Sequence, residues 1–208
     1  RNNRPLEGQA RLENRDLVEY KPKEFAKKFA IVYQQNDIPQ DLTVEKLVMF
    51  GRMPYSSLLK KKTEEDEEAV TWALSCTNLL DKRENDLSAL SGGERQRVWI
   101  AMALAQKSEI LCLDEPTTYL DIYYQLELLE LVKALNDKHG LTIVMVLHDI
   151  NQAIRYSDHV ILMKNGQIVA EGLPREVITK EVIKDVYGVN AVFHEDEQLG
   201  LYMMPLSI

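Results

Sequence analysis

Residues 90–97 read LSGGERQR and place a serine and two consecutive glycines directly before a stretch with helical periodicity. Ser91, followed three residues later by Glu94, forms the pattern of a capping box, in which the two side chains satisfy backbone N–H groups at a helix start. A capping box does not require consecutive glycines, and Gly92 and Gly93 leave backbone N–H groups open to a phosphate at the positive end of the helix. The segment therefore predicts an anion-binding helix start, with a purely structural cap as the alternative.

Two carboxylates follow the apolar run at residues 110–113, which is expected to be a buried strand. Ligands gather beyond the carboxyl ends of the strands in a parallel sheet. Asp114 is placed there to hold Mg²⁺, directly or through water. Glu115 is placed to orient or deprotonate a water that attacks a phosphate. The alternative is a solvated Asp-Glu turn before Pro116.

Two further apolar runs also end in polar side chains. Gln34 follows residues 30–33, and His148 follows residues 142–147. A single histidine at a strand end is more often structural than catalytic. Three strands of one sheet that all end in polar groups nevertheless favour a shared site at their carboxyl ends.

Apolar runs of strand length alternate with helical segments along much of the chain. This alternation predicts an α/β fold with a parallel sheet and helices on both faces. Residues 41–106 are almost entirely helical in pattern and interrupt it, so they are expected to form an inserted helical subdomain within a core made of residues 1–40 and 107–208. Helix caps are predicted at Thr43 and Thr63. The other predicted elements are helices at residues 94–106, 122–138 and 175–187, a helix from Asn151, a hairpin turn at Asn165 and Gly166, and a small terminal sheet from residues 189–193 and 201–204.

The composition narrows the class of protein. The chain has 208 residues and a formal net charge of −8, which argues against a non-specific nucleic-acid binder because such proteins are usually basic. The two cysteines show no metal-ligand spacing and favour a reducing compartment. No apolar run approaches the roughly 20 residues that span a bilayer.

The motifs together resemble those of ABC-type ATPases, in the order in which that family carries them. Residues 90–97 resemble the signature motif, and residues 110–115 resemble the Walker B strand with its catalytic glutamate. Gln34 is similar to the Q-loop glutamine, Asp121 to the D-loop aspartate and His148 to the switch histidine. The resemblance implies a P-loop NTPase (RecA-like) core. Three segments resemble the ATPase subunits of iron-siderophore, haem and cobalamin importers: residues 51–55, 117–122 and 148–153. Among these importers, the resemblance favours iron-siderophore.

The resemblance assigns roles to these positions, with ATP and Mg²⁺ as the cofactors. Gln34 and Asp114 would contact Mg²⁺, while Glu115 and His148 would be catalytic. ABC-type ATPases close as head-to-tail dimers around two nucleotides, so the signature motif contacts the ATP of the opposite subunit and Asp121 crosses the interface. The residues expected at the partner's ATP are Ser91, Gly92, Gly93 and Glu94.

The resemblance also implies partners and a location. A second ATPase subunit completes the dimer, a transmembrane permease contacts residues 41–60, and a substrate-binding protein acts indirectly. Residues 52–55 would lie close to the surface that faces the permease. ATP binding would close the dimer and hydrolysis would reopen it, which drives the permease. The chain would be peripheral, at the cytoplasmic face of the cell membrane, and nucleic acid is not expected as a partner.

One family motif is missing from the chain. None of its nine glycines matches the P-loop pattern G-x-x-x-x-G-K-S/T, whose backbone amides and lysine hold the β- and γ-phosphates. Residues 4–8 stand where the helix after a P-loop would end, so we expect an N-terminally truncated chain with an incomplete sheet, exposed apolar faces and an open edge. Such a chain would have little ATPase activity alone, although residues 91–93 could complete the site of an intact partner.

Two other function classes stay open at this point. One is a soluble ABC-type ATPase that acts on nucleic acid or ribosomes; the acidic charge and residues 51–55 count against it. The other is a non-catalytic ABC-like binding module that never had a P-loop. The presence of Glu115 and His148 counts against that reading, because degenerate ATPases often lose both.

Overall fold

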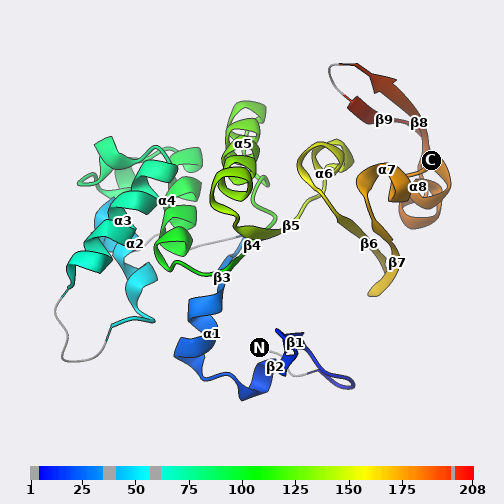
Figure 1. The fold of residues 1–208 in the computed structure, drawn as a ribbon. Helices are drawn as coiled ribbons and strands as arrows, with labels where there is room; N and C mark the ends of the chain where they lie inside the picture. The colour runs from blue at the N-terminus through cyan, green and yellow to red at the C-terminus, as the bar shows by residue number, and fades with distance from the viewer. Residues whose placement is uncertain (1–4, 35–40, 57–61, 198–199) are drawn as a thin grey trace. The chain divides into compact units, whose positions relative to one another are not determined.

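The computed structural model describes residues 5–34, 41–56, 62–197 and 200–208. The chain forms two compact units, Arg1–Val146 and Leu147–Ile208. Figure 1 shows the elements of both units along the chain. No helix among the described residues is long and apolar enough to cross a membrane.

A three-stranded parallel sheet lies at the centre of the first unit (Figure 1). Its strands are β3 (Phe29–Val32), β4 (Ile110–Asp114) and β5 (Thr142–Val146), in that spatial order. The register pairs Ile31 with Cys112 and Cys112 with Val144. The three apolar runs therefore form one parallel sheet as predicted, and their carboxyl ends share one edge.

Among the described residues of the first unit, helices cover one face of this sheet. Ala30, Val32 and Leu111 point to the covered face and join one hydrophobic core with α4 (Gly92–Ala105) and α5 (Ile122–His139). On the opposite face Ile31 is 40% exposed, Val144 53% and Val146 49%. The expectation of helices on both faces is wrong for the described residues, because side chains alternate along each strand and the helices that pack here cover a single face. The predicted exposed apolar face is confirmed.

The segment before α4 is helical, as predicted. It contains α2 (Val44–Met49), the 3₁₀ turn η2 (Phe50–Arg52), α3 (Glu64–Cys76), η3 (Leu80–Lys82) and η4 (Leu87–Ala89). Thr43 caps α2, and Thr63 caps α3 in a capping box with Asp66, so both predicted caps are confirmed. Whether residues 41–106 form a separate subdomain stays a prediction.

Arg52 is a buried cation inside this helical segment. Its side chain is 4% exposed, bonds Asp66 Oδ1 at 2.8 Å and donates to the backbone oxygen of Ala105 at 3.0 Å. Its guanidinium also lies 3.9 Å from the ring centre of Tyr55. Through these contacts Arg52 ties α3 and the end of α4 to η2. Loss of Asp66 would leave the buried Arg52 charge uncompensated, which is strongly destabilising.

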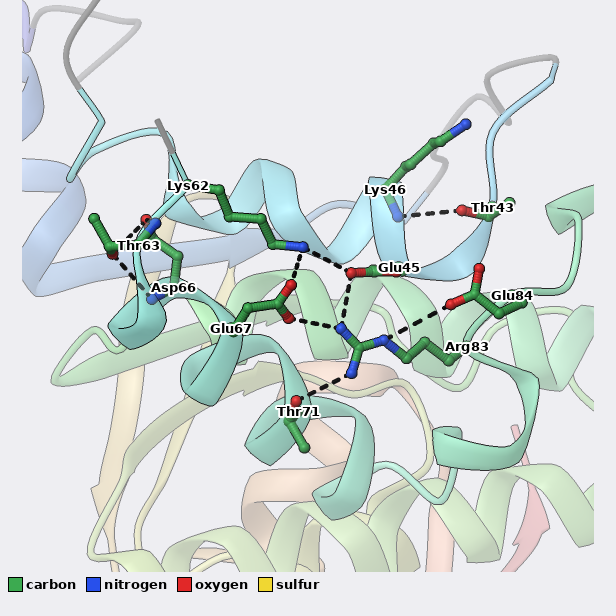
Figure 2. A network of polar contacts seen from close by, with 10 residues as sticks. All are labelled: Thr43, Glu45, Lys46, Lys62, Thr63, Asp66, Glu67, Thr71, Arg83 and Glu84. Carbon is green, nitrogen blue, oxygen red and sulfur yellow. Dashed lines mark hydrogen bonds and ion pairs between the residues drawn. The ribbon is translucent and has the colours of Figure 1, made fainter. Parts of the chain in front are cut away.

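A network of four charged residues joins α2, α3 and the turn after η3 (Figure 2). Arg83 bonds Glu45 at 2.8 Å and Glu67 at 2.7 Å, and Lys62 pairs with the same two carboxylates. These four residues are two cations and two anions, and the exposed carboxylate of Glu84 lies 4.0 Å from Arg83 at the edge of the network. The hydrogen bond from Arg83, followed by the one from Lys62, lowers the pKa of Glu45 from 4.5 to about 2.

Replacing Glu45 with Gln should weaken the protein in a pH-dependent way. The folded-state pKa is depressed, so this stabilisation is present above the unfolded-state pKa of about 4.5 and is lost as pH falls toward 2. After discounting for solvent screening, we expect the free energy of unfolding at pH 7 to fall by about 1–2 kcal/mol, a loss that disappears toward pH 2. Urea unfolding at several pH values measures it.

Glu84→Gln is the matched control, because Glu84 lies 4.0 Å from Arg83 with its side chain 80% exposed. Its free energy of unfolding should stay within about 0.5 kcal/mol of the unaltered chain. Equal losses in both variants, or a Glu45→Gln loss that does not change with pH, would contradict the prediction.

The N-terminal part of the first unit is built from short elements. β1 (Arg11–Leu12) pairs antiparallel with β2 (Arg15–Asp16), followed by η1 (Leu17–Glu19) and α1 (Pro22–Lys28). Pro22 occupies the first turn of α1, where the missing N–H costs nothing. Helix α1 leads directly into β3, and the side-chain amide of Gln106 donates to the backbone oxygens of Ala26 and Phe29. The end of α4 is thereby tied to the start of β3.

The second unit has its own hydrophobic core. After α6 (Ile150–Tyr156), the strands β6 (Val160–Lys164) and β7 (Gln167–Gly172) form a hairpin. The predicted turn is confirmed, with positive φ at Asn165 and Gly166. The predicted terminal sheet is also confirmed, as β8 (Asn190–Asp196) paired antiparallel with β9 (Gly200–Ser207).

One predicted helix in the second unit is wrong. Residues 175–187 form two helices, α7 (Pro174–Val177) and α8 (Lys180–Tyr187). Ile178 leaves the helical conformation with ψ 84°, and the side chain of Thr179 accepts the backbone N–H of Val182. A threonine that caps a new helix competes with continuation of the old one, and the apolar periodicity did not reveal that break.

Candidate functional site

The carboxyl ends of β3 and β4 bring two of the predicted residues into contact. The side-chain amide of Gln34 donates to Oε2 of Glu115 at 2.5 Å. Asp114 is the last residue of β4, directly before Glu115, and both are half-buried. The shared edge of the parallel sheet thus places an amide and two carboxylates together, as the strand pattern predicted.

The turn after β4 fixes the Glu115 carboxylate. The hydroxyl of Thr118 donates to Glu115 Oε2 at 3.1 Å, and the Thr118 backbone N–H donates to the Glu115 backbone oxygen at 3.2 Å. The φ of Glu115 is 47°, a left-handed value that is unfavourable for a residue with a side chain and is kept only where the surrounding contacts hold it. Thr118 is not among the predicted site residues, although a hydroxyl three residues after a carboxylate in a turn is a usable signal.

His148 lies beyond the end of β5 and belongs to the second unit. Its side chain is exposed. The structure therefore brings Gln34 and Glu115 together within the first unit, while the predicted participation of His148 in the same site stays a prediction.

Ser91 caps α4, and its capping box with Glu94 is complete. Glu94 Oε2 accepts the backbone N–H of Ser91 at 2.8 Å and its hydroxyl at 2.9 Å, while the backbone N–H of Glu94 donates to the Ser91 hydroxyl at 3.4 Å. The structural cap is therefore present. It satisfies the N–H groups of Ser91 and Glu94 and accepts nothing from the N–H groups of Gly92 and Gly93, which lie between them in the first turn. Capping and anion binding are compatible at this helix start.

The two glycines have different surroundings. A Cβ at Gly92 would meet no atom within 4 Å, so this residue is open to an approaching ligand. A Cβ at Gly93 would lie 2.6 Å from a ring carbon of Tyr124 on α5. Gly93 is therefore required for the close packing of α4 against α5, and Gly92 is not.

Gly93→Ala should therefore destabilise the protein while Gly92→Ala should not. The added methyl group forces the Tyr124 ring aside, and overpacking of this kind costs about 1–2 kcal/mol of unfolding free energy. At Gly92 the methyl group is free, and alanine favours the helix by about 0.5–1 kcal/mol. Urea denaturation of the two variants compares them directly. Equal stability of the two variants would show that Tyr124 does not constrain position 93.

The groups around Glu94 favour the ionised form of its carboxyl. Glu94 Oε1 pairs with the ammonium of Lys82, the last residue of η3. The Lys82 hydrogen bond, followed by the bonds from Ser91, lowers the pKa of Glu94 from 4.5 to about 2. Lys82 is not among the predicted site residues, because it lies twelve residues before Glu94 on another element and carries no local signal.

Asp121 caps the start of α5, the helix whose first turn carries Tyr124. Its Oδ1 accepts the backbone N–H of Tyr124 at 3.2 Å. Two large apolar residues close to Asp121 in the sequence are exposed, Tyr119 at 82% and Ile122 at 76%.

The donors at the sheet edge fit Mg²⁺ bound together with a nucleotide. The described residues contain no group of three or more His, Cys, Asp or Glu side chains that could hold a metal ion. Mg²⁺ at phosphate sites does not need such a group, because one or two carboxylates bind it together with water and the substrate phosphates. Asp114 and the amide oxygen of Gln34 are donors of the kind that Mg²⁺ prefers.

The chain matches one protein family and many proteins of known name. The family described as ABC transporter matches residues 1–118. The chain is 47% identical over 193 residues to a petrobactin import ATP-binding protein (FpuC) of Bacillus anthracis. The alignment covers 92% of this chain and 71% of that protein. It is 43% identical over 196 residues to the ferric enterobactin transport ATP-binding protein FepC of Escherichia coli, covering 94% of this chain and 72% of that protein.

Solved structures share the fold. CbiO1 from Clostridium perfringens, part of the ABC transporter complex cbiONQ, is similar with a TM-score of 0.75 and 28% identity, covering 88% of this chain and 72% of that one. A dimeric post-hydrolysis state of the ATP-binding cassette MJ0796 with ADP and phosphate gives a TM-score of 0.68 and 30% identity, covering 84% and 76%. The expected P-loop NTPase class of α/β fold is confirmed.

Proposed function

We propose, from the premise that this chain belongs to the ABC transporter family, that it serves as the ATP-binding and hydrolysing subunit of an importer for iron–siderophore complexes. The observation that carries the catalytic part is the 2.5 Å hydrogen bond between Gln34 and Glu115 at the carboxyl edge of the sheet. Members of this family couple ATP hydrolysis to transport. The relatives described above are named for petrobactin and ferric enterobactin, which favours a siderophore over haem or cobalamin as the cargo.

Glu115 orients the water that attacks the γ-phosphate and accepts its proton in this proposal. Gln34 and Thr118 hold the carboxylate in place by their hydrogen bonds. Asp114 and Gln34 would hold Mg²⁺, which neutralises the charge that develops on the phosphates when it is bound. His148 would contact the γ-phosphate.

The signature helix start serves the nucleotide of a second subunit in a head-to-tail dimer. The open N–H of Gly92 and the hydroxyl of Ser91 would donate to that subunit's γ-phosphate, next to Gly93 and Glu94. Asp121 and the exposed apolar side chains around it would lie at the dimer interface. The complete capping box supports this arrangement, because it keeps the helix start formed while donors remain for the phosphate.

A transmembrane permease is the proposed partner of residues 41–60, of which 57–60 lie outside the described residues. Residues 41–106 would act as the helical subdomain of an ATPase core made of residues 1–40 and 107–208. A substrate-binding protein would act through the permease. This assembly places the chain as a peripheral protein at the cytoplasmic face of the cell membrane.

Uptake measurements in the source organism test the cargo. Deleting the coding segment for residues 1–208 should abolish uptake of iron-labelled ferric siderophore and leave cobalamin and haem uptake unchanged. An unaltered copy of the gene should restore uptake, and a copy with Glu115→Gln should not. Loss of cobalamin or haem uptake with siderophore uptake intact would overturn the siderophore assignment.

A further inference from the structure

Three side chains form a continuous polar chain that ends on the signature serine. Lys82 pairs with one oxygen of the Glu94 carboxylate, and the other oxygen accepts both the N–H and the hydroxyl of Ser91. The side chain of Lys82 is 31% exposed and that of Glu94 is 16% exposed. Ion pairs with such partial burial and an additional hydrogen-bonded partner are stronger than isolated surface pairs.

We propose that Lys82 is a positioning residue for Ser91, acting through Glu94. The inference rests on the proposed contact of Ser91 with the ATP of a partner subunit. A glutamate carboxylate held by one oxygen alone can rotate about its last side-chain bond. Lys82 holds the second oxygen and fixes the plane of the carboxylate toward the helix start.

The fixed carboxylate matters when the Ser91 hydroxyl changes partner. In this structure the hydroxyl donates to Glu94. To donate to a phosphate it must leave that bond, while the backbone N–H of Ser91 still needs an acceptor. With Lys82 in place, Glu94 continues to accept this N–H, so the helix start keeps its cap as the hydroxyl turns to the phosphate.

The position of Lys82 is set independently of Glu94. The neighbouring Arg83 is bound to Glu45 and Glu67 on α2 and α3 (Figure 2). The backbone N–H of Glu45 also donates to the Arg83 backbone oxygen at 3.0 Å. The segment that carries Lys82 is therefore anchored on two helices before its side chain reaches Glu94. This is the preorganisation that a positioning residue requires.

The contact itself is tested by NMR on Lys82→Met, with Lys62→Met as the matched control. Both variants remove one lysine from an ion pair in the same helical segment, but Lys62 pairs with Glu45 and Glu67 and does not touch Glu94. Lys82→Met should raise the pKa of the Glu94 carboxyl and speed hydrogen exchange at the Ser91 amide. Lys62→Met should change neither. An unchanged Glu94 pKa and Ser91 amide in Lys82→Met would overturn the proposal.

The functional consequence is tested by mixing the chain with an ABC-type ATPase subunit that has an intact P-loop and an alanine in place of its own signature serine. The unaltered chain should stimulate ATP hydrolysis by this subunit, and Lys82→Met should lower the stimulated kcat about tenfold with a smaller change in KM. Lys82→Arg should recover the stimulation to within about twofold, because it restores the charge-assisted bond. Lys62→Met should stay within about twofold of the unaltered chain.

Ser91→Ala separates failure of this inference from failure of the proposed function. If Ser91→Ala abolishes the stimulation while Lys82→Met retains it, the positioning role is overturned and the proposed function stands. If the unaltered chain gives no stimulation, the proposed function is overturned, and the role of Lys82 with it. Loss of stimulation in Lys82→Met with an unfolding midpoint equal to that of Lys62→Met supports positioning over a purely structural role.

Discussion

A polypeptide of residues 1–208 alone is expected to hydrolyse ATP at least about a thousandfold more slowly than the same polypeptide with an ABC-type strand–P-loop–helix segment joined ahead of residue 1. The reason is that the chain lacks the hydrogen-bond donors that bind a triphosphate. The chain contains no G-x-x-x-x-G-K-S/T sequence, so no P-loop lysine or amide nest neutralises the triphosphate. Asp114 and Glu115 alone bring negative charge to a negatively charged substrate, which raises the barrier.

Phosphate release by the two purified polypeptides measures this difference. A joined segment in which the P-loop lysine is replaced by alanine is the control, and it should give no gain. The joined segment should also cover the exposed apolar face of the sheet, where Ile31, Val144 and Val146 lie. We therefore expect less self-association by analytical ultracentrifugation. Appreciable turnover by residues 1–208 alone that Glu115→Gln abolishes would contradict the prediction.

The parallel sheet was predictable because its information is local. Strands β3, β4 and β5 are short apolar runs bounded by polar residues, and each run can be found without knowing its neighbours. The same holds for the caps at Thr43, Thr63 and Ser91, whose partners are three residues away. The hairpin turn at Asn165 is specified by two adjacent residues.

Features that depend on contacts between distant segments are not specified by any local sequence pattern. The uncovered face of the sheet is set by which helices are available to pack on it, and apolar periodicity shows only that a strand has two apolar faces. Lys82 reaches Glu94 because Arg83 anchors the segment on other helices, and no spacing rule relates these positions. The meeting of Gln34 and Glu115 was predictable only from sheet topology, because parallel strands bring their carboxyl ends together.

Glu115→Gln in the polypeptide with the joined P-loop segment is expected to lower kcat by about a hundred- to a thousandfold while leaving ATP binding nearly unchanged. Glutamine has the same shape, and its side-chain oxygen can still accept from Gln34 and Thr118, which both donate to Glu115. It cannot take a proton from the attacking water. The variant should therefore bind ATP and accumulate in the closed dimer, so size-exclusion chromatography with ATP should detect more dimer than with the unaltered protein.

Thr118→Val is the matched variant, because it removes one hydrogen bond to Glu115 and keeps the carboxylate. Its kcat should fall only about three- to tenfold, since Gln34 still holds the same oxygen. A glutamate that acts only as a structural link between β3 and β4 would give the opposite order: Gln at position 115 would preserve the link and the activity, and loss of the Thr118 hydroxyl would cost at least as much. The ratio of the two kcat values therefore separates a general base from a structural contact.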